Sequence, residues 1–251
     1  MSGHLAHDWL TPQWPAPARV KSCVTTRAGG VSADPFVSLN LGDHVGDDPV
    51  AVAKNRQRLV SLLGCRPAWL SQVHGVAVAE ASPDLLVEAD ASWSATPGVA
   101  CAIMTADCLP ALFCDRAGTR VAAAHAGWRG LAAGVLEASV AALGCPPSEV
   151  LVWLGPAIGP QAFEVGGEVR AAFMAHDPAA ADAFRVVPGT NDTWLGDLYL
   201  LARQRLARVG VTAIHGGGLC TVSDAQRFYS FRRDRVTGRM ASVIWRVEET
   251  T

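Results

Sequence analysis

Residues 99–130, VACAIMTADCLPALFCDRAGTRVAAAHAGWRG, contain three short apolar runs separated by polar turns. The runs are Val99–Thr105, Pro110–Cys114 and Arg120–His125. Each is apolar along its whole length and not only at every second position, which is typical of strands that are buried on both faces. We therefore expect three adjacent strands of one buried sheet, followed by a helix from about Gly130 to Leu143.

Further strands and helices are predicted on both sides of this stretch. Asp48 followed by Pro49 is a typical helix start, because Asp caps the first amides and Pro fits the first helical position, and Gly64 would end that helix. Asp197–Val209 also has helical periodicity. Strands are expected at Val20–Thr25, Val150–Leu154, Phe228–Phe231 and Ala241–Val247. The mixture predicts α/β or α+β layers, with no readable strand order.

The composition is that of a globular protein. The 251 residues fit a single domain over 1–251, with Pro178–Asp182 as a loop and not a domain boundary. The chain has 21 basic and 23 acidic residues, so a bulk basic field for nucleic acid or anionic membrane is absent, and we expect neither partner. No apolar run approaches the length of a membrane span.

The expected location is the cytoplasm. Met1–Gln13 lacks a basic segment followed by an apolar core, as a secretory signal would have. The seven cysteines are an odd number without a close-paired CxxC, so a disulfide framework is not expected and a reducing compartment is the natural setting.

Three potential metal ligands lie where the apolar runs end. They are His74, Cys108 and His125. One cysteine and two histidines suit zinc with an open fourth position, and the same set suits copper. Their wide separation in sequence excludes a local zinc finger. Taken singly, each has an ordinary alternative, since a lone cysteine in an apolar run is usually a core residue and a lone histidine is usually a hydrogen-bonded structural one.

Other polar groups suggest an anion site and an acid or base. The turn His125–Gly130 (HAGWRG) opens a helix, and its free amides together with Arg129 favour phosphate, although the glycines also suit a tight turn alone. Five arginines near the C-terminus fit a phosphate or ribose contact, or, for most of them, a solvated hairpin: Arg227, Arg232, Arg233, Arg235 and Arg239. Glu164 could be a general base, a hydroxyl binder or a helix cap.

Seven ordered motifs resemble those of the YfiH family, also called laccase-domain or multicopper polyphenol oxidase proteins, and the resemblance covers nearly the whole chain. Together they are far more specific than any one of them. The motifs are SLNLGDHVGDDP (38–49), SQVHG (71–75), TADCLP (105–110), AHAGWRG (124–130), WLGPAIGP (153–160) with FEVG (163–166), FYSFRRD (228–234) and TGRMAS (237–242).

The resemblance implies a fold, a metal and an activity. The fold is a layered α/β/β/α sandwich with mixed sheets, related to cysteine-hydrolase-like toxins such as CNF. The family's zinc ligands match His74, Cys108 and His125. Members are described as phosphorolysing adenosine, inosine and methylthioadenosine to a base and a ribose 1-phosphate, and as deaminating adenosine. Copper-dependent polyphenol oxidation and editing of peptidoglycan precursors are also linked to the family.

We therefore expect a zinc-dependent purine nucleoside phosphorylase with adenosine deaminase activity. Asp107 or Glu164 is the expected proton carrier, and Asn40, Arg129 and Arg232 are expected to bind substrate or phosphate. A copper oxidase is an alternative, although the chain lacks enough clustered histidines for several coppers. In another alternative, a cysteine hydrolase, Cys108 is a nucleophile activated by His125. The oligomeric state is not predicted.

Overall fold

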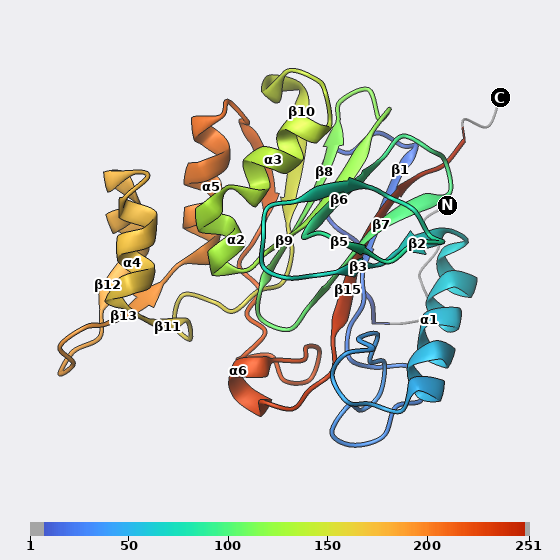
Figure 1. Cartoon of the computed structure of the whole chain (residues 1–251), viewed down its shortest axis with the longest axis horizontal. Helices are drawn as coiled ribbons and strands as arrows, with labels where there is room; N and C mark the ends of the chain where they lie inside the picture. The colour runs from blue at the N-terminus through green and yellow to red at the C-terminus, as the bar shows by residue number, and fades with distance from the viewer. Residues whose placement is uncertain (1–7, 249–251) are drawn as a thin grey trace.

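Two β-sheets packed face to face form the centre of the computed structural model, which describes residues 8–248 (Figure 1). Met1–His7, part of the segment without a signal-like pattern, lies outside the described residues. The larger sheet has the order β14-β10-β8-β9-β6-β4, and the second has the order β1-β15-β7-β2. Both mix parallel and antiparallel pairs. Their strands are β14 Ala213–Gly216, β10 Val150–Leu154, β8 Leu109–Asp115, β9 Val121–Ala126, β6 Ala91–Ser94, β4 Val78–Glu80, β1 Val20–Val24, β15 Met240–Arg246, β7 Val99–Thr105 and β2 Arg66–Ala68.

Helices cover the outer faces of both sheets, which gives four layers. Along β8, Ala111 and Phe113 pack with helices α3 (Val135–Ala142) and α5 (Leu198–Arg208), whereas Leu112 and Cys114 pack against the second sheet. The outer face of the second sheet packs on Leu59 of α1 (Pro49–Leu63). The central strands are therefore buried on both faces, and this removes the alternation that a half-exposed strand would show. The expectation of a mixed α/β fold with several mixed sheets is confirmed.

One prediction about strand neighbours was wrong. β8 and β9 are adjacent and antiparallel, as expected, but β7 lies in the facing sheet, between β15 and β2. The turn at 106–108 carries the chain from one sheet to the other. Because a run buried on both faces has the same composition in either sheet, the sequence pattern does not distinguish a neighbour in the plane from one across the core.

Helix ends were predicted well, but one helix is interrupted. Asp48 caps α1 by accepting a hydrogen bond from the Val50 amide, and Gly64 ends it in the left-handed conformation. Asp197 caps α5 in the same way. The expected helix over 130–143 is two helices, α2 (Trp128–Ala133) and α3, because Gly134 between them has φ of 109°.

Two further predictions were wrong in local detail. Phe228–Phe231 is not a strand, because it leads into a short helix, α6 (Phe231–Asp234), which Ser230 caps by accepting from the Arg233 amide. Pro178–Asp182, expected as a loop, lies in a 3-10 helix that spans Pro178–Ala183. The strands predicted near Val20, Val150 and Ala241 are confirmed as β1, β10 and β15.

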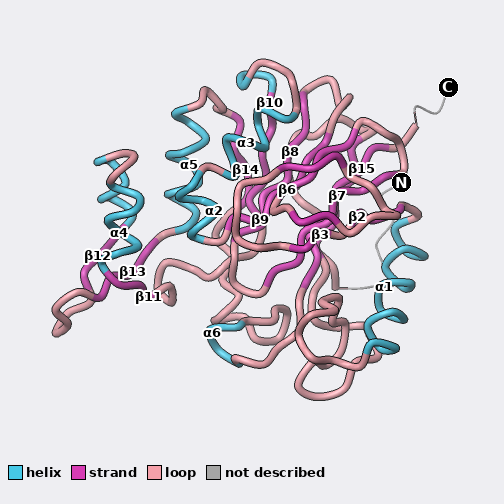
Figure 2. Tube along the Cα trace, in the orientation of Figure 1, coloured by secondary structure: helices cyan, strands magenta, loops and turns pink. Residues whose placement is uncertain are grey.

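A small three-stranded sheet and one helix extend from one side of the central sheets (Figure 2). They consist of β11 (Glu164–Gly166), β13 (Thr193–Gly196), β12 (Phe184–Val186) and α4 (Gly167–Met174). The remaining elements are β3 (Leu70–Ser71), paired with β5 (Val87–Glu88), and a short 3-10 helix at Pro147–Glu149. Within residues 8–248, no helix combines the length and apolarity that a membrane crossing requires.

Tyr199 holds the loop that follows β10, so we expect Tyr199→Phe to destabilise the protein. The hydroxyl of the buried Tyr199 accepts from the Ala157 amide at 2.9 Å and donates to the Leu219 carbonyl at 2.6 Å. Removing it leaves these groups without their partner, and we expect a loss of about 1–3 kcal/mol in the free energy of unfolding. Urea denaturation measures this, and a loss below about 0.5 kcal/mol would contradict it.

Candidate metal centre and its cavities

His74, Cys108 and His125 converge at one end of the central sheets. His74 lies in the loop before β4, Cys108 in the turn between β7 and β8, and His125 on β9. Cys108 Sγ is 3.7 Å from His74 Nε2, and one ligand atom from each residue lies within 4.8 Å of the others. Donor atoms around tetrahedral zinc are roughly 3.3–3.6 Å apart. The three residues therefore fit a metal ion after a small inward movement, and no other such group occurs within residues 8–248.

The pleat of β9 explains the position of His125. Val121 and Ala123 point between the two sheets, and His125 follows on the same face of the strand, where the strand reaches the rim. His125 is 4% exposed. A polar side chain is therefore brought to the edge of an apolar layer, facing Cys108 from the neighbouring segment.

Asp90, which was not among the predicted residues, supports both histidines. One carboxylate oxygen accepts from His125 Nδ1 at 2.8 Å and from the His74 amide at 2.9 Å. The other accepts from the amides of Gly75 at 2.6 Å and Val73 at 3.2 Å. With Nδ1 engaged, His125 presents Nε2 to the centre, which is the usual arrangement behind a metal-bound histidine.

Cys108 and His125 form an ion pair within this group of ligands. Burial opposes ionisation of the Cys108 thiol, but His125 and His74 outweigh it and lower the pKa to about 6. Burial also opposes protonation of His125, yet Cys108 and Asp90 raise its pKa to about 9. At neutral pH the pair is therefore a thiolate beside an imidazolium, as in reactive cysteine sites.

Strained backbone and a glycine bring the ligands together. His74 and Asp107 have φ of 63° and 95°, a region that non-glycine residues rarely occupy. The Asp107 carboxylate accepts from the Thr221 hydroxyl and from the Arg232 amide, each at 2.6 Å, and this anchors the turn that presents Cys108. A Cβ on Gly127 would lie 2.6 Å from His74 Cδ2 and 3.1 Å from Cys108 Sγ, so only glycine fits there.

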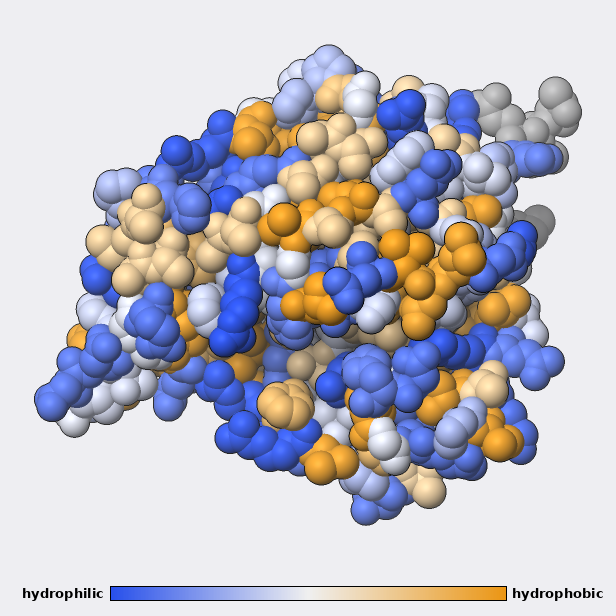
Figure 3. All heavy atoms as spheres, in the orientation of Figure 1, coloured by the Kyte–Doolittle hydropathy of each residue, from blue (hydrophilic) through white to orange (hydrophobic). Residues whose placement is uncertain are grey.

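Two cavities meet at this centre, and the space-filling view shows a hollow beside the segment that carries α6 (Figure 3). The arginine cavity, of about 300 Å³, is lined by Arg129, Arg232 and Arg235 together with aromatic side chains. The second cavity, of about 260 Å³, is lined by groups that include His44, Gln72, Met104 and Arg239. The two share four lining residues: His74, Ala106, Cys108 and Phe231.

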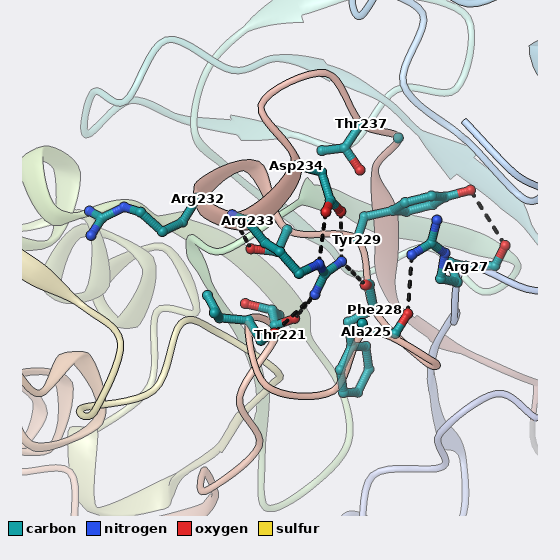
Figure 4. A network of polar contacts seen from close by, with 12 residues as sticks. Arg27, Thr221, Ala225, Phe228, Tyr229, Arg232, Arg233, Asp234 and Thr237 are labelled. Carbon is teal, nitrogen blue, oxygen red and sulfur yellow. Dashed lines mark hydrogen bonds and ion pairs between the residues drawn. The ribbon is translucent and has the colours of Figure 1, made fainter. Parts of the chain in front are cut away.

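The arginines of the C-terminal cluster divide into structural and cavity groups. Arg233 pairs with Asp234 and donates to the carbonyls of Thr221 and Phe228 (Figure 4). Arg227 pairs with Asp224. In Figure 4 the side chain of Arg232 points away from this network, and it donates to the carbonyls of Ala162 and Glu164. The expectation of a solvated hairpin was wrong, because the segment forms a short capped helix.

The predicted site residues have different surroundings. Asp107, Arg129 and Arg232 line the arginine cavity, and Arg129 lies over the Trp128 ring, 4.4 Å from its centroid. Asn40 and Glu164 line neither cavity. Asn40 is fully buried and its amide binds the main chain of Gly42 and Arg239, whereas the side chain of Glu164 lies on an exposed part of β11.

The chain matches, over residues 21–247, the model of a protein family described as multi-copper polyphenol oxidoreductase laccase. It belongs to this family. Purine nucleoside phosphorylase PA4543 of Pseudomonas aeruginosa is 69% identical over 238 residues, which cover 94% of this chain and 98% of that protein. Purine nucleoside phosphorylase YfiH of Escherichia coli is 58% identical over 240 residues, with the same coverage.

Solved structures agree with the assignment. NMB0706 of Neisseria meningitidis matches with a TM-score of 0.94 at 53% identity and covers 96% of this chain and 100% of that one. YlmD of Geobacillus stearothermophilus matches with a TM-score of 0.90 at 32% identity, covering 98% of each chain. The predicted resemblance to the YfiH family is confirmed. The relatives bear the names of enzymes, which supports the prediction that this family member is an enzyme.

Because Asp90 orients both histidines, we expect Asp90→Asn to weaken metal binding by about 10- to 100-fold. The amide replaces one acceptor oxygen by a donor that faces the Gly75 amide or the His125 ring. Competition with a chromophoric chelator measures the affinity. Asp115→Asn is the matched control, since Asp115 is also buried and accepts from the Thr119 and Arg120 amides at the far end of β8. Equal losses in both variants would contradict a specific role for Asp90.

The number of protons released when a metal binds should depend on the protonation of Cys108 and His125. Ligands must be deprotonated to bind, and between pH 6 and 9 Cys108 is already a thiolate while His125 still carries its proton. We expect about one proton released per metal near pH 7.5, more below pH 6 where Cys108 is also protonated, and fewer above pH 9. Calorimetry in buffers of different ionisation enthalpy measures the number, and no release at pH 7.5 would contradict the ion pair.

Proposed function

We propose that this protein is a zinc-dependent purine nucleoside phosphorylase that acts on adenosine, inosine and methylthioadenosine. The observation that carries the proposal is the arginine cavity, which opens directly onto the His–Cys–His centre. Three guanidinium groups line it against one carboxylate, that of Asp107. Such a surplus of positive charge suits a phosphate dianion. The names of the relatives in Pseudomonas aeruginosa and Escherichia coli support the same reaction and small-molecule substrates.

The proposed reaction transfers the ribosyl group from the base to phosphate. The bond between C1′ and N9 breaks, and its electron pair goes to the purine. A phosphate oxygen forms the new bond to C1′, and the proton that this oxygen carried ends on the released base. The products are a free purine and ribose 1-phosphate, so no other reactant is needed.

The residues at the centre would bind, orient and exclude water. Arg129 and Arg232 would hold the phosphate, with Arg232 fixed in direction by the carbonyls of Ala162 and Glu164. His74, Cys108 and His125 would hold zinc, which supplies a Lewis acid that polarises an oxygen of a bound reactant. Asp107 is better placed than Glu164 to carry a proton, because Asp107 lines the cavity beside Cys108.

We further propose that adenosine deamination occurs at the same centre. Water would replace the amino group at C6 of the purine, with release of ammonia and formation of inosine. Asp107 is the proposed proton carrier, since it directly precedes Cys108, which lines both cavities.

A cysteine hydrolase is the second candidate, favoured by one observation. Cys108, His125 and Asp90 form a chain in which the thiolate faces an imidazolium that is held by a buried carboxylate. This is the arrangement that nucleophilic cysteine catalysis requires, with Asp90 as the orienting group. A copper polyphenol oxidase has less support, because within residues 8–248 only one cluster of ligands could hold a metal and a laccase needs several.

Base release from inosine should require phosphate if the protein is a phosphorylase. With zinc-loaded protein, we expect ribose 1-phosphate and hypoxanthine in equal amounts, and base release lower by at least about 100-fold without phosphate, because water is a poorly positioned substitute in an anion site. Chromatography of both products measures this. Arg129→Met should raise the KM for phosphate by about 10-fold, since it removes one charge-assisted contact.

Other outcomes would separate the candidates. Base release that does not depend on phosphate would contradict the phosphorylase. Hydrolysis of an amide substrate that survives strong chelation but is lost after alkylation of Cys108 would support the cysteine hydrolase. Activity on phenols that follows copper content and not zinc content would support the oxidase.

A further inference from the structure

The second cavity lies across the metal centre from the arginine cavity and differs from it in chemistry. Its lining has one guanidinium, that of Arg239, and no carboxylate. The thioether of Met104 and the ring of Phe231 provide apolar surface, and the ring of His44 adds a flat polar group. A lining with one guanidinium, imidazole rings and apolar surface suits a flat heterocycle better than the three guanidinium groups of the arginine cavity do.

The wall of this cavity is preorganised. The Gln72 side chain donates to the Met104 carbonyl and accepts from the Met104 amide, each at 2.8 Å. Both ends of the amide are therefore engaged, and the loop that leads to His74 is tied to the end of β7. A wall held in this way keeps its shape when a ligand enters, which reduces the entropy lost on binding.

Arg239 lines this cavity and keeps hydrogen-bond donors for a ligand. Its main-chain amide donates to Asn40 at 2.9 Å, and Nη1 donates to the carbonyls of Thr237 at 3.0 Å and Gly238 at 3.1 Å. Within residues 8–248 the side chain donates hydrogen bonds through Nη1 alone, so Nε and Nη2 are available to a ligand. Asn40, predicted to bind substrate, thus supports the residue that we assign to this role.

Phe231 lies between the two cavities and contributes to the lining of both. It begins α6, lines both cavities and is 49% exposed. In phosphorolysis the entering phosphate and the leaving base lie on opposite sides of the ribose C1′. Two cavities that meet along a shared edge provide these two positions, with the ribose between them at the metal centre.

We propose that the second cavity binds the purine base and that Arg239 donates to the base and stabilises the negative charge it gains as the bond between C1′ and N9 breaks. The inference rests on the proposed phosphorylase function and assigns phosphate to the arginine cavity. The electron pair of the broken bond is delocalised over the purine ring, and its nitrogen or oxygen acceptors face the free donors of Arg239. A guanidinium keeps its charge throughout, so it acts by electrostatic stabilisation and not by proton transfer.

The test measures binding of the free base separately from turnover. Hypoxanthine is titrated by calorimetry into zinc-loaded wild-type protein, Arg239→Met and the matched control Arg129→Met. We expect Arg239→Met to weaken hypoxanthine binding by about 10- to 100-fold and to lower kcat for inosine, with the KM for phosphate unchanged. Arg129→Met should leave hypoxanthine binding within about 2-fold of the wild type. Arg239→Lys, which retains the charge but not the planar fork, should be intermediate.

Two further outcomes would each overturn one of the two proposals. If Arg239→Met raises the KM for phosphate and leaves hypoxanthine binding unchanged, the inference is overturned and the roles of the two cavities are exchanged. If wild-type protein binds hypoxanthine through Arg239 but releases no base with phosphate, the phosphorylase proposal fails while the base site stands. Urea denaturation measures whether each variant is folded. If Arg239→Met is unfolded, Arg239→Lys and Phe231→Ala are tested in its place, and we expect weaker hypoxanthine binding in both.

Discussion

The buried carboxylate of Asp90 is the interaction on which the site depends. It accepts four hydrogen bonds, one from the His125 ring and three from consecutive amides of the loop that carries His74. A buried charge is stable only when its acceptor sites are satisfied, and this requirement fixes the loop and the ring together. The pKa of Asp90 is lowered: burial opposes ionisation, but the hydrogen bonds from His125 and the loop amides outweigh it. The carboxylate therefore stays ionised and serves as a rigid frame for two ligands.

A similar arrangement supports the third ligand from the other side. Asp107 precedes Cys108 and accepts hydrogen bonds from Thr221 and from the main chain of Arg232. The turn between the two sheets is thus connected to α6, whose first residue, Phe231, separates the cavities. Arg232 of the arginine cavity and Cys108 of the candidate metal centre are therefore positioned by one short network.

The sequence predicted the three candidate ligands but not the carboxylate that holds two of them in place. His74, Cys108 and His125 could be found because each is a polar residue beside a predicted strand, and the family motifs joined them. Asp90 could not be found, because an aspartate in a short segment has no periodic or compositional sign that it is buried. Strand content was predictable from apolarity, whereas the placement of β7 in the facing sheet depends on a three-residue turn whose direction no pattern encodes. The helix break at Gly134 was not predicted, because an isolated glycine inside a helix is often tolerated.

The pairing of β8 with β9 sets the distance between two of the candidate ligands. Cys108 directly precedes Leu109, which lies opposite Ala126 in this pair, and His125 lies opposite Pro110. His74 approaches the same point from the loop before β4, a strand of the same sheet. A shift of one residue in the register of β8 against β9 would therefore move Cys108 away from His125, so the hydrogen-bonded ladder of the sheet also serves as the ruler of the site.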